Sequence, residues 1–219
     1  MLASPSRRLA LAALLAAWCA LLVGVRVAVT GSAFGTFLAW NLTLAAVPLA
    51  ASTALVRLDG RGGGGAALVA VGAVWLLFFP NAPYILTDLV HLAARPPVPF
   101  WYDLAVLLSA AGVGLLAGYV SLADVQGVVA RRWGGAAGWA VSVGALFLGA
   151  FGVYLGRELR WNSWDVATAP LAVARDVVGP VLDPAAHPGA VVVTAVFGGM
   201  LTAGYVALKA LAAPPAGAR

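Results

Sequence analysis

The stretch Gly134–Gly156, GGAAGWAVSVGALFLGAFGVYLG, is a long apolar run that contains no charged residue. At 1.5 Å rise per residue in an α-helix, such a run crosses the ~30 Å hydrocarbon core of a bilayer. Similar runs predict five further crossings, at Leu9–Val25, Phe34–Val56, Ala66–Thr87, Leu104–Ala123 and Gly189–Leu208. We therefore expect an all-α, polytopic transmembrane bundle of about six helices, with short interfacial helices on its outer face.

The composition excludes an ordinary soluble protein. The chain has 219 residues, of which 63% are hydrophobic and 10% charged, whereas soluble domains carry about 25% charged residues. Little chain remains between the runs, so we expect one integral membrane domain over residues 1–219. We interpret residues 9–25 as an additional, uncleaved N-terminal helix, because no signal-cleavage pattern leads into a soluble domain.

The basic residues predict the orientation. Of the 13 Lys and Arg residues, eight fall in segments on the side of the N-terminus and five on the other side. The positive-inside rule then places both termini in the cytoplasm. On that side, Arg57–Gly65 and Asp124–Trp133 are interpreted as connectors. The net charge of +5 indicates contact with anionic membrane lipids and not with nucleic acid.

The segment Phe78–Leu92, FFPNAPYILTDLVHL, is the most informative motif. Pro80 and Pro83 lack an N–H, so a helix crossing them leaves carbonyl groups unpaired. Asn81 is suited to satisfy those carbonyls. From Pro83 onward the pattern is helical again, and one polar face of about 80° collects Asn81, Tyr84, Asp88, His91 and Arg95.

Two interpretations of this polar face remain open. In one, it is an interfacial helix on which Asp88 pairs with His91, or His91 with Arg95. In the other, Asp88 and His91 bind a metal ion or move a proton. A divalent metal is a candidate cofactor, although no specific metal-binding motif identifies one.

A second motif, Phe100–Asp103 (FWYD), opens the fourth crossing. Its Trp and Tyr are typical of the aromatic belt at a membrane surface. Asp103 is interpreted as a cap of the helix or as a charge that favours its positive end. The alternative is a ligand or base turned into the bundle.

A third motif, Gly156–Asp165 (GRELRWNSWD), follows the fifth crossing. If the helix continues, Arg157, Arg160 and two tryptophans share a face; alternatively, Asn162 or Ser163 starts a new helix with Asp165 in its first turn. The arginines can bind an anionic group such as a lipid phosphate. The competing interpretation is a self-neutralising ion-pair lattice of Asp88, Asp103, Glu158 and Asp165 with Arg95, Arg157 and Arg160.

All three motifs are predicted to share one face of the membrane, because two crossings separate the third motif from the other two. Clustered ionisable groups near hydrocarbon indicate a site. The candidate catalytic residues are Asp88, His91, Asp103, Glu158 and Asp165. The candidate anion-binding residues are Arg157, Arg160 and Arg95, and the candidate structural residues are Asn81, Pro80, Pro83, Tyr84, Trp161, Asn162 and Trp164.

These motifs resemble a bacterial membrane family catalogued as domain of unknown function 1361. The resemblance rests on Phe79–Tyr84 (FPNAPY), Thr87–Leu92 (TDLVHL), Trp101–Asp103 (WYD) and Arg160–Asp165 (RWNSWD). It covers about residues 35–210 and leaves the first helix largely outside. It implies a multi-pass protein of the bacterial cytoplasmic (inner) membrane and carries over no catalytic role.

Three functions therefore stay open, and enzymatic activity is undecided among them. The first is a membrane-embedded enzyme or lipid-handling protein with a polar site on the extracytoplasmic face. The second is a structural or assembly protein without catalysis. The third, a small transporter, is disfavoured because we expect no ionisable residue within the first, second, fourth, fifth or sixth crossing.

Overall fold

The computed structural model describes residues 5–212, and residues 1–4 and 213–219 lie outside it. The prediction that Arg219 is cytoplasmic therefore falls outside the described residues. Every regular element in the described range is helical, which confirms the all-α prediction. In chain order the elements are α1 (Pro5–Thr30), α2 (Phe37–Gly60), α3 (Gly65–Phe78), α4 (Asn81–Tyr84), the 3₁₀ helix η1 (Ile85–His91), α5 (Phe100–Trp133), α6 (Gly135–Arg157), α7 (Asp165–Thr168), α8 (Pro170–Leu182), the 3₁₀ helix η2 (Pro184–Ala186) and α9 (Pro188–Leu211).

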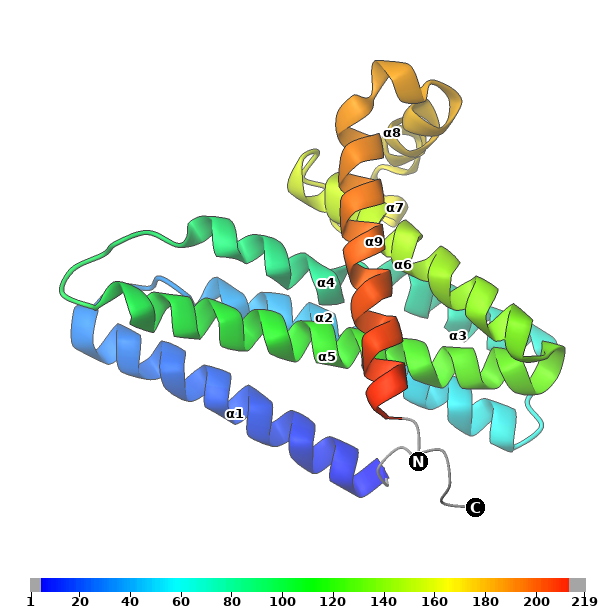
Figure 1. Cartoon of the computed structure of the whole chain (residues 1–219), viewed down its shortest axis with the longest axis horizontal. Helices are drawn as coiled ribbons and strands as arrows, with labels where there is room; N and C mark the ends of the chain where they lie inside the picture. Colours follow the sequence, from blue (N-terminus) through cyan, green and yellow to red (C-terminus); the bar gives the residue numbers. More distant parts are fainter. Residues whose placement is uncertain (1–4, 213–219) are drawn as a thin grey trace.

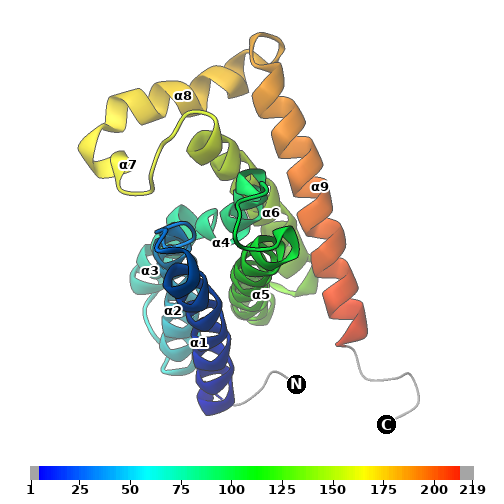
Figure 2. The same ribbon diagram turned by 90° about the vertical axis from the view of Figure 1, so that its left-hand side faces the viewer.

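Helix α5 forms the centre of the bundle and makes its most extensive contacts with α2 and α6. Helices α1, α2 and α5 run side by side along the long axis, whereas α9 packs against α6 and crosses the bundle steeply (Figure 1). Viewed from the end, α7 and α8 form an arm that runs above α3 and α4 to the start of α9 (Figure 2). This arm is the part of the described chain that covers the candidate site.

Within residues 5–212, six stretches are long and apolar enough to cross a membrane, as predicted. Their bounds are Ala10–Thr30, Phe37–Gly60, Gly65–His91, Phe100–Trp133, Gly135–Arg157 and Pro188–Leu211. Large apolar side chains such as Leu14, Val69 and Val196 are exposed on them. That is the surface expected of helices that face lipid.

The prediction that Asp124–Trp133 is a connector between two crossings is wrong. Helix α5 continues through this segment as a single helix of 34 residues. At 1.5 Å per residue this helix is about 51 Å long, so it is tilted or extends beyond the hydrocarbon core. Its charged end is held by an ion-pair cluster in which Asp59 accepts hydrogen bonds from Arg131 and Arg132, each at 2.7 Å.

The third crossing is interrupted where its prolines predict a break. Helix α3 ends at Phe78, and the Asn81 Nδ2 donates to the Phe78 carbonyl at 2.9 Å, which confirms the role expected of that amide. The chain then continues as α4 and η1. The chain beyond Pro83 is helical as expected, but residues 85–91 form a 3₁₀ helix and not an α-helix. This helix ends at His91, so the expected polar face does not reach Arg95, which lies in the following loop.

Small residues on α5 and α6 make room for this interrupted segment. A Cβ at Gly118 of α5 would lie 2.9 Å from the Ala82 Cβ, and one at Gly152 of α6 would lie 2.6 Å from the Pro80 Cβ. These separations are shorter than any ordinary carbon–carbon contact. Close packing through glycine is a common way for membrane helices to approach one another, and here it wedges α4 between two crossings.

Candidate functional site

A cavity of about 890 Å³ lies between α2, α3, α4, α6, the α6–α7 loop and α8; we call it the lateral pocket. Its apolar lining includes Leu44, Ala73, Leu76, Leu77, Leu148 and Phe151. Its polar and aromatic lining includes Trp40, Asn41, Asn81, Tyr84, His91, Arg157, Arg160, Trp161, Asn162 and Ser163.

The polar residues gather toward one end of the lateral pocket. These polar residues lie near the N-terminal end of α2 and near the C-terminal ends of the α3–α4 segment and of α6. The apolar lining residues lie in the adjoining helical turns. Because α2 runs opposite to α3, these positions coincide along the bundle (Figure 1). The lining side chains of Trp40 and Leu148 are 57% and 55% exposed, so the pocket adjoins the surface that faces lipid.

Two arginines line the pocket without a strong protein partner. The Arg157 Nη1 lies 3.9 Å from the Asp88 Oδ1, which is too far for a hydrogen bond. Among the residues that the structure describes, neither the Arg157 nor the Arg160 guanidinium group donates a hydrogen bond to another residue. Arg160 also has a positive φ of 63°, an uncommon conformation for a residue with a side chain.

Asp88 is buried beside the pocket, with 2% of its surface exposed. Its Oδ2 accepts a hydrogen bond from the Asn41 Nδ2 at 2.8 Å. Among the described residues, no hydrogen bond or ion pair joins Asp88 to His91, whose ring is exposed and meets the Phe37 ring edge-on at 5.3 Å. The carboxylate therefore belongs to a contact between η1, α2 and the end of α6.

The first and third motifs meet directly. The Asn81 Nδ2 donates to the Ser163 Oγ at 3.0 Å, and that hydroxyl donates to the Leu77 carbonyl at 3.2 Å. These bonds dock the α6–α7 loop on the interrupted third crossing and satisfy carbonyl groups near the proline break. The Trp164 ring also meets the Trp40 ring edge-on at 6.1 Å.

The loop between α6 and α7 is held by two acidic residues. The Trp161 Nε1 donates to Asp176 of α8 at 2.8 Å. The Asp165 carboxylate accepts the Asn162 backbone N–H at 2.7 Å, and this hydrogen bond lowers the pKa of Asp165 below its ordinary value. Asp165 begins α7, so the interpretation with a new helix is confirmed and the continuous helix is wrong.

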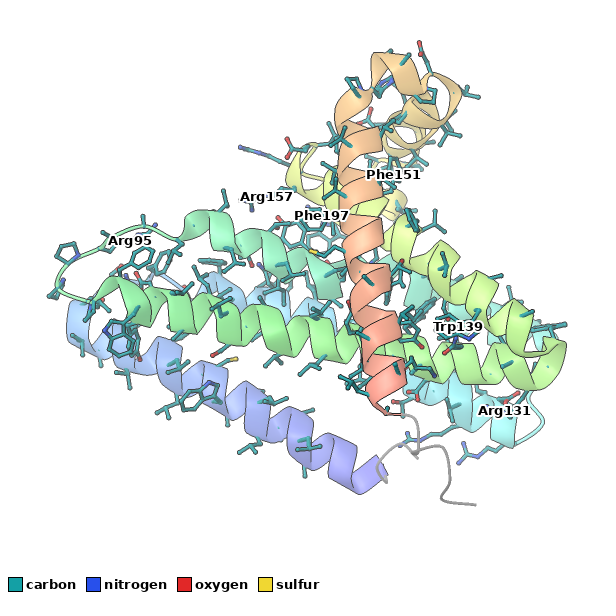
Figure 3. The ribbon with its side chains drawn as sticks, viewed as in Figure 1. Arg95, Arg131, Trp139, Phe151, Arg157 and Phe197 are labelled. Carbon is teal, nitrogen blue, oxygen red and sulfur yellow. The ribbon has the colours of Figure 1, made fainter. Side chains whose placement is uncertain are left out.

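The second motif lies elsewhere. Asp103 is buried in an ion pair with Arg26 of α1, whose Nε and Nη2 donate to the two carboxylate oxygens at 2.6 and 3.2 Å. It makes no side-chain cap, so the cap interpretation is wrong, but it lies in the first turn of α5, at the positive end of the helix, as the alternative expected. Arg95 stacks on Phe34, with its Cζ 4.0 Å from the ring centroid, and is 3.9 Å from Asp103. Arg95 and Arg157 are well separated (Figure 3).

The acidic and histidine candidates do not assemble into a metal centre. Within the described residues, no group of three or more His, Cys, Asp or Glu side chains is placed to hold a metal ion. Glu158 is exposed and makes no side-chain hydrogen bond or ion pair to the described part of the chain. Of the predicted lattice, only two loose pairs form, Asp88 with Arg157 and Asp103 with Arg95, each at 3.9 Å.

The sequence profile described as "Protein of unknown function (DUF1361)" matches residues 40–203. The chain belongs to the DUF1361 family. No curated protein and no solved structure matches it significantly. In this DUF1361 protein the matched range contains every polar residue of the lateral pocket named above, whereas α1 and its Arg26 lie outside it.

The sequence patterns do not predict the contacts of two residues of this DUF1361 protein, Asn41 and Arg26. Asn41 was visible only as one polar residue within a crossing, and Arg26 only as a charge at the end of one. Arg26 is 2% exposed and Asp124, which accepts a hydrogen bond from Ser52 at 3.1 Å, is also buried. Arg26 and Asp124 lie beyond the predicted bounds Leu9–Val25 and Leu104–Ala123, but within the candidate spans Ala10–Thr30 and Phe100–Trp133.

Proposed function

We propose that this DUF1361 protein binds an anionic membrane lipid in the lateral pocket. The lipid phosphate lies against Arg157 and Arg160, and the acyl chain follows the apolar lining. The observation that carries this function is the pair of guanidinium groups beside one cavity whose donors are unused by the described protein residues. A guanidinium group only donates, and its geometry matches the oxygens of a phosphate.

The shape of the pocket supports an amphiphilic ligand. Its volume of about 890 Å³ is within the range of sites that enclose small molecules, roughly 300–1,000 Å³. The apolar lining continues to exposed residues of α2 and α6, including Trp40 and Leu148. A headgroup can therefore enter the pocket while the remainder of its acyl chains stays in the bilayer.

Asp88 fits this function as a positioning residue. Its carboxylate accepts a hydrogen bond from Asn41 and lies 3.9 Å from the Arg157 guanidinium, too far for a hydrogen bond. This arrangement attracts the guanidinium toward the pocket and leaves its N–H groups for a ligand. We assign binding to these residues, and no reaction is needed to account for their placement.

Mass spectrometry of lipids bound to the detergent-purified protein tests this function. We expect anionic lipid to co-purify with the wild type and to fall several-fold in an Arg157→Gln/Arg160→Gln double variant. The matched control is Arg175→Gln, which changes an exposed arginine of α8 that does not line the pocket. Equal amounts of anionic lipid in all three proteins would contradict lipid binding here and favour a structural role for the α6–α7 loop.

We also propose that the protein lies in the bacterial inner membrane, with the Asp59–Arg131–Arg132 end in the cytoplasm. The bias of basic residues supports this orientation, and Arg95 and Arg131 lie at opposite ends of the bundle (Figure 3). A membrane-impermeant maleimide should label Val98→Cys in intact spheroplasts and spare Arg61→Cys. The reverse pattern would contradict the orientation.

A further inference from the structure

Three asparagine side chains line the lateral pocket, and each uses its NH₂ group on the protein. The acceptors are a carboxylate in two cases and a backbone carbonyl in the third. The bonds run from Asn41 to Asp88 at 2.8 Å, from Asn81 to the Phe78 carbonyl at 2.9 Å, and from Asn162 to Asp165 at 3.2 Å.

These partners determine which way each amide is turned. The Phe78 carbonyl and the ionised Asp165 carboxylate can only accept hydrogen bonds, so they must face the NH₂ groups of Asn81 and Asn162. The Asn41 NH₂ group faces the Asp88 Oδ2 at 2.8 Å. The Oδ1 atoms of Asn41, Asn81 and Asn162 accept no hydrogen bond from the residues that the structure describes. The pocket therefore combines donor-only arginines with amide oxygens that can accept.

Building on the proposed function, we infer that the lateral pocket selects a lipid whose phosphate is linked to a polyol, such as glycerol or a sugar. The phosphate satisfies Arg157 and Arg160, and the hydroxyl groups donate to the asparagine oxygens. Indole rings of Trp40 and Trp161 line the same cavity and offer apolar faces to the C–H groups of a polyol. A zwitterionic headgroup is disfavoured because its ammonium group would lie close to the two arginines.

A comparison of headgroups at constant charge isolates the hydroxyl contribution. Phosphatidylglycerol and phosphatidylethanol are both phosphodiesters with one negative charge, but only the first carries free hydroxyl groups. Native mass spectrometry of the full chain, titrated with each lipid at matched acyl chains, should favour phosphatidylglycerol. A net hydrogen bond corresponds to roughly a 2- to 12-fold preference. Phosphatidylethanolamine should bind more weakly than either.

One variant removes a proposed acceptor with little change to the loop. Asn162→Ala deletes the amide oxygen but keeps the backbone N–H that donates to Asp165 at 2.7 Å. We expect the Asn162→Ala variant to bind phosphatidylglycerol over phosphatidylethanol with a smaller ratio of affinities than the wild type. The matched control is Thr168→Ala, which deletes another hydrogen bond to Asp165 at 3.3 Å without touching the pocket and should retain the full preference.

The outcomes separate this inference from the proposed function. Equal binding of phosphatidylglycerol and phosphatidylethanol by the wild type would overturn the polyol inference and leave anionic lipid binding intact. Failure of both lipids to bind would overturn the proposed function. Soluble glycerol phosphate that competes as strongly as the lipid would support the polyol inference, but it would identify a free headgroup as the ligand.

Discussion

Arg26 of α1 and Asp103 of α5 form a buried ion pair, and its two hydrogen bonds span 77 positions of the chain. The guanidinium also lies over the Phe34 ring, with its Cζ 4.4 Å from the centroid. Its remaining Nη1 is buried without a partner in the described residues. This pair therefore fixes the first helix, which the family profile does not cover, to the centre of the bundle.

Replacing one residue of this pair should lower the free energy of unfolding more than replacing both residues. Asp103→Leu leaves the Arg26 charge buried and uncompensated, so we expect a loss of about 3–5 kcal/mol in the free energy of unfolding. The double variant Arg26→Met/Asp103→Leu removes both charges and should recover a large part of that loss. Unfolding in mixed detergent measures both. A double variant as unstable as the single one would contradict the pairing.

The contact between α6 and the proline break predicts a position-specific effect of alanine. Gly152→Ala places a methyl group against the rigid Pro80 ring and should destabilise the protein by roughly 1–3 kcal/mol through overpacking. Gly144→Ala lies in the same helix with no atom within 4 Å of the added carbon. Thermal unfolding should distinguish the two variants. Equal melting temperatures would show that α4 is not wedged as described.

The strained backbone of Arg160 should lower the stability of the protein, while its side chain contributes to ligand binding. Its φ of 63° suits glycine, and holding another residue in such a conformation costs on the order of 1–3 kcal/mol. Arg160→Gly should therefore lose bound anionic lipid while its stability stays equal or rises. Arg160→Ala should lose the same lipid without the gain in stability. Lipid content and melting temperature of the two variants test this, and a glycine variant less stable than the alanine one would contradict it.

The turn at residues 162–168 should open in acid. The Asn162 backbone hydrogen bond lowers the pKa of Asp165 from its ordinary 3.8. A carboxyl group with a lowered folded pKa stabilises the turn above the unfolded pKa and loses that effect as pH falls through the folded value. The NMR shift of the Asn162 amide proton should thus stay constant down to about pH 4 and change below it. Asp165→Asn should abolish the transition, whereas a transition near pH 6 would contradict this assignment.

The crossings and the proline break are predictable because they depend on local pattern. Charge-free runs long enough for the bilayer mark the six crossings, and Pro80 and Pro83 mark the interruption. The end of α5 is not predictable in this way. Asp124 and Arg131 resemble loop charges, but the helix continues through them because Asp124 is buried against other helices and Asp59 of α2 binds Arg131.

The candidate site is predictable only in part. An even number of crossings implies that the first and third motifs share a side, and the Asn81–Ser163 bond joins them. Asn41 and Arg26 carry no such signal, because each acts through a partner far along the chain. Their roles depend on which helices become neighbours, and a single sequence does not encode that in any local pattern.

A density map of the full chain in a nanodisc containing phosphatidylglycerol would show whether a lipid occupies the lateral pocket. Lipid binding predicts a phosphate within hydrogen-bond distance of both Arg157 and Arg160, with an acyl chain continuing along Leu76 and Leu148. A pocket that contains no lipid density, with both arginines turned onto Asp88 or Glu158, would contradict it.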